Sequence, residues 1–351
     1  MKKQTIFYAL AFVLMILDSK TAIHAAADGV RLCLEAVIPS LLPFMALSTM
    51  LTGLLAHQTF RILKPLCRLF HVPEHCQGIL LLSFLGGYPT GAQAIAQAAK
   101  DGTISQETAR RMLAFGSNAG PSFLFGMGAA LFPKQWMCWA LWAIHIFSSM
   151  LVSQCFRTDN IELGRSEPPK SLQFTQAMAR SVSIMGLICG WVICFRVVLA
   201  FLDRWLLWRF PNWVRCLVCG MLELSNGSLA LTQLDSVALR FILFSFLLGF
   251  GGICVAMQTY AVTEGIDATL YLPGKLLHGI FSAVLASALF SREMLLTSLI
   301  LITILFLTSK KGIAFGPSMM YNKANRSGRK TPCSFAKRSS PSAPTAPTLP
   351  S

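Results

Sequence analysis

Long apolar runs separated by short polar stretches recur along almost the whole chain. A helix needs about 20 predominantly apolar residues to cross the hydrocarbon of a bilayer. The pattern therefore predicts an all-α, polytopic membrane protein with about eight to ten transmembrane helices. Several of the expected spans are short or interrupted, and their ranges are 5–17, 37–55, 78–96, 112–132, 135–156, 181–202, 213–233, 237–262, 268–290 and 294–308.

The composition agrees with a chain whose main solvent is lipid. Hydrophobic residues make up 54% of the chain and charged residues 13%, and the mean hydropathy is +0.59. Soluble domains carry about 25% charged residues, so a single large soluble core is not expected. We expect a multi-pass protein of a cell membrane, with the lipid bilayer as its first partner.

The net charge of +15 is distributed unevenly. Residues 310–338 contain many lysines and arginines and no acidic residue. Much of the remaining basic excess lies in short loops between apolar runs, as the positive-inside rule predicts. Basic runs beside a membrane commonly anchor its topology, so we expect no nucleic-acid partner.

The polar stretches divide the chain along its length. Residues 1–156 are expected to form an N-terminal membrane half and residues 171–309 a C-terminal membrane half, with 157–170 as a polar linker. Residues 310–351 are basic, then rich in Ser and Pro, with no apolar period. That composition predicts a disordered tail.

Helix-breaking residues cluster inside several apolar runs. In hydrocarbon, backbone polar groups must be paired within the protein, so a broken helix persists only where protein or a water-filled cavity supplies partners. Transporters place their solute sites at such breaks. Two prolines close together in the second run predict a break or a simple kink, and both alternatives stay open. The candidate break residues are Pro39, Pro43, Gly86, Gly87, Pro89, Gly91, Gly120, Pro121, Gly227, Gly251 and Gly252.

The two halves show a short internal similarity. An aromatic-apolar run ends in glycines at 82–87, and a similar run ends in glycines at 244–252. Paired breaks at corresponding positions of two halves are a sequence indication of a transporter site. We therefore expect two repeats with interrupted helices.

Polar side chains stand beside these breaks in otherwise apolar surroundings. Charged groups inside a membrane are costly and tend to be functional. Lys275 could pair with Glu223, bind an anionic solute, or extend to the interface. Except for Lys275, we expect the candidates to converge on one polar cavity between the two halves. The candidate substrate-binding residues are Thr90, Asn118, Glu223, Asn226, Gln258 and Lys275.

The sequence contains none of the local motifs of a membrane enzyme. There is no GxSxG, no HExxH, no acidic pair and no phosphate-binding glycine loop. The pair Cys216 and Cys219 forms one CxxC in an apolar stretch, which we interpret as packing rather than a metal site. We expect no catalytic residue, no metal and no cofactor, and the protein is not expected to be an enzyme.

The break motifs together resemble a known family. Gly86–Ala92 (GGYPTGA), Ser117–Pro121 (SNAGP), Glu223–Gly227 (ELSNG) and Gly251-Gly252 with Gln258 are similar to motifs of the YlbJ-type sporulation integral membrane proteins. The early stretch Pro39–Phe44 (PSLLPF) is similar to that family's proline motif. The resemblance covers about residues 30–290 in the same order.

The resemblance implies a bacterial membrane protein of a spore-former type, carrying the nucleoside-recognition or Gate domain with one gate-like repeat in each half. Sporulation members are linked to the movement of dipicolinate, a small aromatic dianion. The implied function is a transporter or permease for a small polar or anionic solute, either nucleoside-like or an aromatic dicarboxylate. The alternative is a solute-binding gate subunit or receptor that does not transport, and an oligomer is compatible with either.

Overall fold

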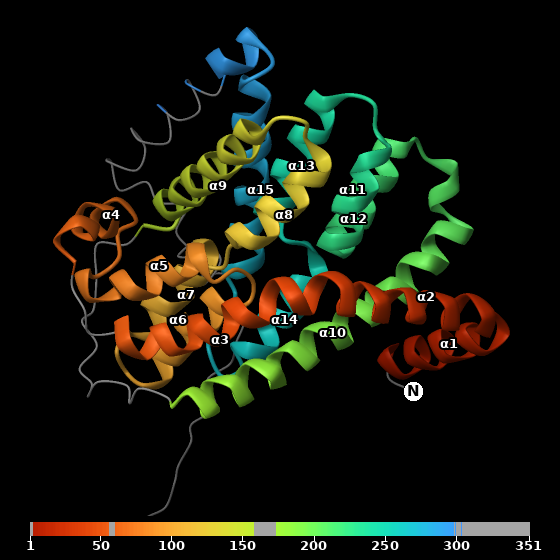
Figure 1. The fold of residues 1–351 in the computed structure, drawn as a ribbon, viewed down its shortest axis with the longest axis horizontal. Coiled ribbons are helices and arrows are strands. Elements are labelled where there is room, and N and C mark those ends of the chain that lie inside the picture. Colours follow the sequence, from red (N-terminus) through yellow and green to blue (C-terminus); the bar gives the residue numbers. More distant parts are fainter. Residues whose placement is uncertain (1–2, 56–59, 158–172, 298, 300–302, 304–351) are drawn as a thin grey trace, which may run out of the picture. The chain divides into compact units, whose positions relative to one another are not determined.

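The computed structural model describes residues 3–55, 60–157 and 173–297, together with 299 and 303. Every element in these ranges is a helix, which confirms the all-α prediction (Figure 1). All of the expected linker except Arg157, and the whole expected tail 310–351, lie outside the described residues.

The N-terminal part contains nine α-helices and the C-terminal part six in the described residues. The first group is α1 (Lys3–Leu17), α2 (Ser19–Leu32), α3 (Ile38–Leu55), α4 (Lys64–Leu69), α5 (Gln77–Leu85), α6 (Thr90–Lys100), α7 (Gln106–Phe115), α8 (Pro121–Leu131) and α9 (Gln135–Cys155). The second group is α10 (Phe174–Trp205), α11 (Asn212–Leu222), α12 (Leu224–Ala230), α13 (Val237–Phe250), α14 (Gly252–Val262) and α15 (Tyr271–Ala288).

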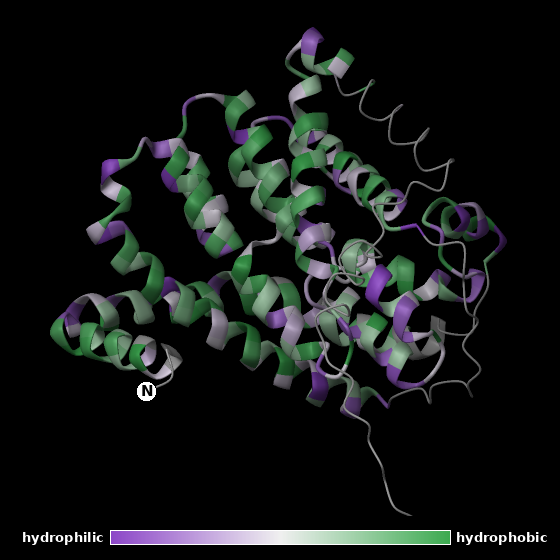
Figure 2. Cartoon of the chain, turned by 180° about the vertical axis from the view of Figure 1, so that it is seen from behind, coloured by the Kyte–Doolittle hydropathy of each residue, from purple (hydrophilic) through white to green (hydrophobic). Residues whose placement is uncertain are grey.

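Three stretches of the described chain are long and apolar enough to cross a membrane, namely Gln135–Cys155, Phe174–Trp205 and Val237–Val262. A fourth arises if the bent pair Tyr8–Leu17 and Ser19–Val37, which meet at 99°, counts as one span. Apolar residues dominate these helices in Figure 2. Length and composition therefore support an integral, multi-pass membrane protein.

Several of the other expected spans are divided into pairs of short helices. The range 78–96 is split between α5 and α6, and 112–132 between α7 and α8. The range 213–233 is split between α11 and α12. Each of these helices is too short to cross the hydrocarbon alone, because one residue adds only about 1.5 Å. This division is why fewer continuous spans are found than the apolar pattern predicts.

The expected break at Pro39 and Pro43 is absent, because α3 runs without interruption from Ile38 to Leu55. A π-helical turn at Cys33–Val37 leads directly into α3. Pro39 lies in the first turn of α3, where a proline is tolerated, and the wider preceding turn relieves the contact of its ring with the earlier carbonyl. These two prolines are therefore accommodated in one helical segment.

Helices of the N-terminal part pack against helices of the C-terminal part. Helix α15 contacts α13, α9 and α7, while α10 contacts α2 and α3 (Figure 1). A Cβ added to Gly249 of α13 would lie 2.8 Å from the Cα of Gly279 in α15. Small residues permit such close approach of helix backbones in membranes, so α13 and α15 are held backbone to backbone.

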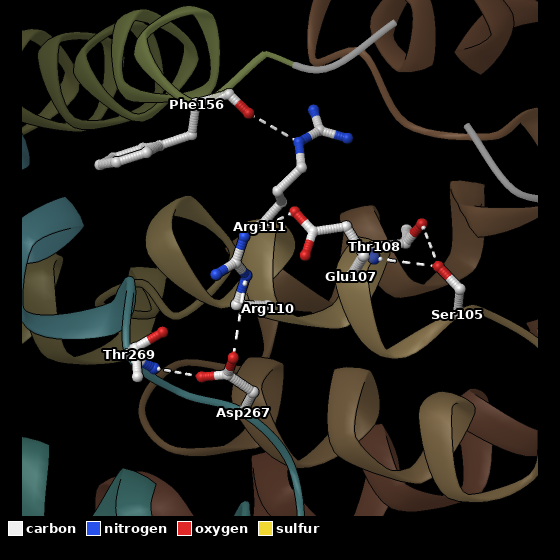
Figure 3. A network of polar contacts seen from close by, with 8 residues as sticks. All are labelled: Ser105, Glu107, Thr108, Arg110, Arg111, Phe156, Asp267 and Thr269. Atoms are coloured by element: carbon white, nitrogen blue, oxygen red, sulfur yellow. Dashed lines mark hydrogen bonds and ion pairs between the residues drawn. The ribbon is translucent and has the colours of Figure 1, made fainter. Parts of the chain in front are cut away.

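The two arginines of α7, Arg110 and Arg111, are held by a polar network (Figure 3). Arg111 is buried, and its Nε donates to the carbonyl of Phe156 at 2.6 Å. Arg110 pairs with Glu107 at 2.8 Å and lies 3.9 Å from Asp267. Backbone carbonyls therefore accept from Arg111, whereas Arg110 is held by ion pairs and its Nε makes no hydrogen bond among the described residues.

Helix α7 begins after a serine cap. Ser105 is the N-cap, and its hydroxyl accepts from the backbone N–H of Thr108 at 3.1 Å. A serine N-cap satisfies one of the unpaired amides at a helix start.

Candidate functional site

A cavity of about 560 Å³ lies between helices from both ends of the chain. Its N-terminal wall is formed by the segment from α2 to α3, the turn at Tyr88, and α8. Its C-terminal wall is formed by α10, α12 and α14. Most lining side chains are apolar. The polar ones are Glu35, Tyr88, Ser122, Glu223, Ser225 and Gln258.

Two interruptions in the N-terminal part of the chain meet at this cavity. Helix α5 ends at Leu85 and α6 begins at Thr90, while α7 ends at Phe115 and α8 begins at Pro121. A Cβ added to Gly120 would lie 2.9 Å from the Cα of Gly87. The two turns are thus in backbone contact, and together they present Tyr88 and Ala119 to the cavity.

Glu223 occupies the interruption between α11 and α12. Its carboxylate accepts from the backbone N–H of Ser225 at 3.0 Å and of Asn226 at 2.7 Å. It also accepts from Nδ2 of Asn226 at 2.6 Å. The side chain is buried yet lines the cavity. Three N–H donors therefore satisfy this carboxylate, which is how a buried acid without a cationic partner is tolerated.

Helix α14 lines the opposite wall through Val255 and Gln258, and the interruption between α13 and α14 lies beside the Tyr88 ring. Gly251 adopts a left-handed conformation with φ of 84°. A Cβ there would lie 3.1 Å from the Tyr88 ring, whose hydroxyl donates to the carbonyl of Leu248 at 2.9 Å. Gly251 therefore supplies both the turn and the space that hold the Tyr88 ring in place.

Lys275 is buried behind this wall rather than inside the cavity. Its Nζ donates to the carbonyl of Ser117 at 2.7 Å and lies 3.2 Å from Nδ1 of His278. The same atom lies 4.9 Å from the centre of the Tyr88 ring. No carboxylate among the described residues forms an ion pair with it. The suggested pair with Glu223 is thus absent, and with 0% of its surface exposed Lys275 does not reach an interface.

The predicted residues do not share one polar cavity in this structure. Glu223 and Gln258 line the 560 Å³ cavity, whereas Thr90 and Asn118 are buried outside its lining. Asn226 lines a second cavity of about 530 Å³. The candidates therefore fall into three groups: two line the first cavity, one lines the second, and three are buried in the protein around them.

The two cavities follow one another along α10. The first touches Ile188 and Val192, and the second touches Arg196 and Arg204. Leu229 of α12 lines both. One helical turn covers about 5.4 Å, so the cavities are close neighbours with α12 between them.

The charged residues of the second cavity form ion pairs. Arg196, which interrupts the apolar pattern of α10, pairs with Asp28 at 3.3 Å. Arg215 pairs with Asp203 at 2.6 Å. Arg196 therefore lines the second cavity and has an acidic partner.

Sequence reasoning missed two histidines that touch the Lys275 group. His278 follows Lys275 by three positions on α15, a spacing that places both side chains on one helix face. His145 lies within the apolar run of α9, and no local pattern distinguishes it. Their rings stack with centroids 4.5 Å apart. Only the packing of α9 against α15 reveals this relationship.

The comparisons with known proteins agree with the membrane character of the fold. The chain is similar to the sporulation integral membrane protein YlbJ of Bacillus subtilis (strain 168), with 25% identity over 329 residues. This match covers 79% of the chain and 80% of the relative. No family model matches the chain, and no solved structure does.

Proposed function

We propose that this chain, which is similar to the sporulation integral membrane protein YlbJ, moves a small polar or anionic solute across a bacterial membrane. The solute would bind in the cavity lined by Tyr88, Glu223 and Gln258. A role during sporulation is part of the proposal, since the relative is named for it. A nucleoside-recognition, or Gate, function likewise remains part of the proposal.

One observation carries this proposal: interrupted helices from both ends of the chain meet around a single cavity. The turns at Gly87 and Gly120 contact each other on one side, and the turn at Glu223 and helix α14, which follows the turn at Gly251, line the other. Solute sites of transporters are built in this way, because broken helices offer polar groups within an apolar environment. The arrangement supports a binding site at the junction of two membrane parts.

The chemistry of the lining suits a small solute with an aromatic body and polar edges. A volume of about 560 Å³ lies within the range of small-molecule sites, about 300–1,000 Å³. Apolar walls and the Tyr88 ring can pack against an aromatic ring, while Gln258, Ser122 and Ser225 can hydrogen-bond its substituents. Nucleosides and small aromatic dicarboxylates such as dipicolinate both have this form.

The second cavity supports movement rather than binding alone. It begins where the first ends along α10, and α12 with the Glu223–Asn226 contact stands between them. Helix α12 has only seven residues, and its Gly227 is in backbone contact with Gly220 of α11, so we expect the α11–α12 hairpin to move as one unit. Shifting it would join the two cavities into one path.

A transport screen in proteoliposomes tests the proposal. Purified protein is reconstituted, and uptake of nucleosides is compared with uptake of small aromatic dicarboxylates. We expect saturable flux of one class, lost in Gln258→Leu, which keeps the approximate volume and removes the amide. Flux equal to that of empty liposomes for every solute would contradict the proposal.

Binding without flux would instead favour the alternative function, a gate subunit or receptor that does not transport. Equilibrium binding to the detergent-solubilised protein is therefore measured on the same solutes. Saturable binding together with absent flux would identify that alternative.

A further inference from the structure

Three ionisable side chains lie together in the protein beside the cavity. Lys275 and His278 project from α15, and His145 projects from α9. The exposed fractions are 0% for Lys275 and His278 and 1% for His145. Among the described residues, no carboxylate pairs with any of them. The group is thus a buried set of basic nitrogens without an acid to neutralise it.

The hydrogen bonds define the protonation of His278. Its Nε2 lies 2.9 Å from the carbonyl oxygen of His145. A carbonyl oxygen only accepts, so Nε2 carries a hydrogen and donates it. In the neutral ring, Nδ1 then has a free lone pair, and this atom lies 3.2 Å from Nζ of Lys275.

The contact between Lys275 and His278 therefore accommodates only one extra proton. If the proton is on Lys275, the ammonium donates to Nδ1. If it is on His278, Nδ1 donates to the neutral amine. Protonating both would place two N–H groups against each other 3.2 Å apart without an acceptor. Removing the proton leaves a neutral amine and a neutral imidazole.

His145 lies next to this pair, and its hydrogen bond defines the tautomer of its neutral ring. Its Nε2 accepts the backbone N–H of Ala119 at 3.2 Å, so the neutral ring carries its hydrogen on Nδ1. That Nδ1 is buried without a hydrogen-bond partner among the described residues. Because its ring stacks on His278, protonation of both imidazoles is disfavoured by like-charge repulsion.

Only a thin wall separates this group from the solute cavity. Tyr88 and Ala119 line the cavity. On their other side, Nζ of Lys275 faces the Tyr88 ring at 4.9 Å, and Nε2 of His145 accepts from Ala119. Among the described residues, the ionisable groups that face the pair are His145 from α9 and Tyr88 from the α5–α6 turn. Tyr271 of α15 lies near Tyr88, and Glu35 and Glu223 line the cavity on the far side of that ring.

We propose that Lys275 and His278 form a one-proton site that couples proton binding to occupancy of the neighbouring solute cavity. This inference rests on the proposed transport function. An anionic solute in the cavity is attracted to the protonated, positively charged pair across Tyr88, where the low-polarity surroundings screen little. By thermodynamic linkage, the anion then increases the affinity of the pair for its proton by the same factor.

Proton uptake on solute binding tests this inference. Detergent-solubilised protein in a weakly buffered solution with a pH indicator is mixed with pyridine-2,6-dicarboxylate. We expect about one proton to be taken up per dianion bound, so that the medium becomes more alkaline. In the double variant Lys275→Met, His278→Gln neither side chain can hold the proton, so we expect the dianion to bind without uptake. His24→Gln, at an exposed position of α2, is the matched control and keeps the uptake.

The same variants in proteoliposomes separate this inference from the proposed function. Solute flux with no accompanying proton movement, or identical proton movement in the double variant, overturns the inference and leaves transport intact. If the wild-type protein moves no solute, the proposed function fails, and nitrogen NMR of labelled histidines decides on the proton site alone. A one-proton site requires the His278 nitrogen signals to change in Lys275→Met. Unchanged signals and an independent titration of His278 overturn it.

Discussion

Asn226 donates from Nδ2 to the Glu223 carboxylate at 2.6 Å, although the two side chains line different cavities. They are three residues apart at the start of α12, so one short turn of helix separates the two spaces. This contact is the polar part of the barrier between the cavities. Its loss has separable consequences for stability and for solute movement.

Replacing Glu223 with Gln tests the role of the carboxylate. The amide nitrogen cannot accept, so at least one of the three N–H donors loses its partner. We expect the variant to insert, with its free energy of unfolding lowered by about 1–3 kcal/mol. Solute flux should fall by about tenfold or more, the factor that corresponds to about 1.4 kcal/mol. Thermal unfolding and proteoliposome flux measure the two effects.

The exposed Glu264 offers a matched control, since Glu264→Gln removes the same charge away from both cavities. Its flux and stability should equal those of the wild type. Normal flux in Glu223→Gln would show that Glu223 is only a structural cap of α12.

Replacing Gly251 with Ala tests the support of the Tyr88 ring. Gly251 has a φ of 84°, and its new Cβ would lie 3.1 Å from the Tyr88 ring. We expect the free energy of unfolding to fall by about 1–2 kcal/mol, because alanine is strained in the left-handed conformation. We also expect weaker solute binding, because the added methyl group displaces the Tyr88 ring. Gly265→Ala is the control, because its φ is 82° and nothing lies within 4 Å of the added Cβ. Equal solute affinity in both variants would contradict the role given to Gly251.

Replacing Gly249 with Val tests the contact between α13 and α15. The added atoms would meet the backbone of Gly279 at 2.8 Å, and overpacking of this kind costs about 1–3 kcal/mol. Gly190→Val in α10 is the control, since nothing lies within 4 Å of a Cβ there. Unfolding in detergent should show a large loss only for Gly249→Val. A loss of similar size in the control would indicate a general effect of valine in these helices.

Two buried thiols, Cys67 in α4 and Cys76 shortly after it, should lower the free energy of unfolding in alkaline solution. Burial raises the pKa of Cys67 from 9.0 to about 11 and that of Cys76 to about 12. In the unfolded chain these thiols ionise at lower pH, so unfolding releases protons in this range. Their stabilising contribution is complete below about pH 9 and declines as the pH rises toward 11 and 12.

The double variant Cys67→Ala and Cys76→Ala should lose less stability between pH 8 and about pH 11 than the wild type. Chemical unfolding at both pH values measures the difference. A decline of the same steepness in both proteins would assign the alkaline sensitivity to other groups. A lower stability of the double variant at pH 8 alone leaves this comparison valid, because the slope with pH is the quantity measured.

The helical fold was predictable because it follows from local chemistry. Apolar runs that bury their own backbone hydrogen bonds have few alternatives to helices in lipid. The interruptions at 86–89 and 116–120 likewise follow from glycine and proline, which disfavour the interior of a helix. The two prolines of α3 left a break and a kink open, and the sequence could not decide between them because no residue pattern announces the π-helical turn that precedes Pro39.

The arrangement of side chains was harder to predict because it depends on packing between distant helices. Glu223 and Asn226 are close in sequence, yet the position of α12 places them in different cavities. Lys275 was singled out correctly as an unusual charge, but its neighbours come from α9 and from the turns at Tyr88 and Ser117. His145 has no local feature that distinguishes it from an ordinary buried histidine.

The backbone contact of Gly249 with Gly279 has a mechanical consequence. Two helices that touch along their main chains cannot slide or tilt separately, so α13 and α15 must behave as one rigid body. Lys275 and His278 are attached to that body. Helix α12 is short and is not part of that body. Any motion of α12 that connects the two cavities would therefore carry it past Lys275 and His278, which stay in place on α15.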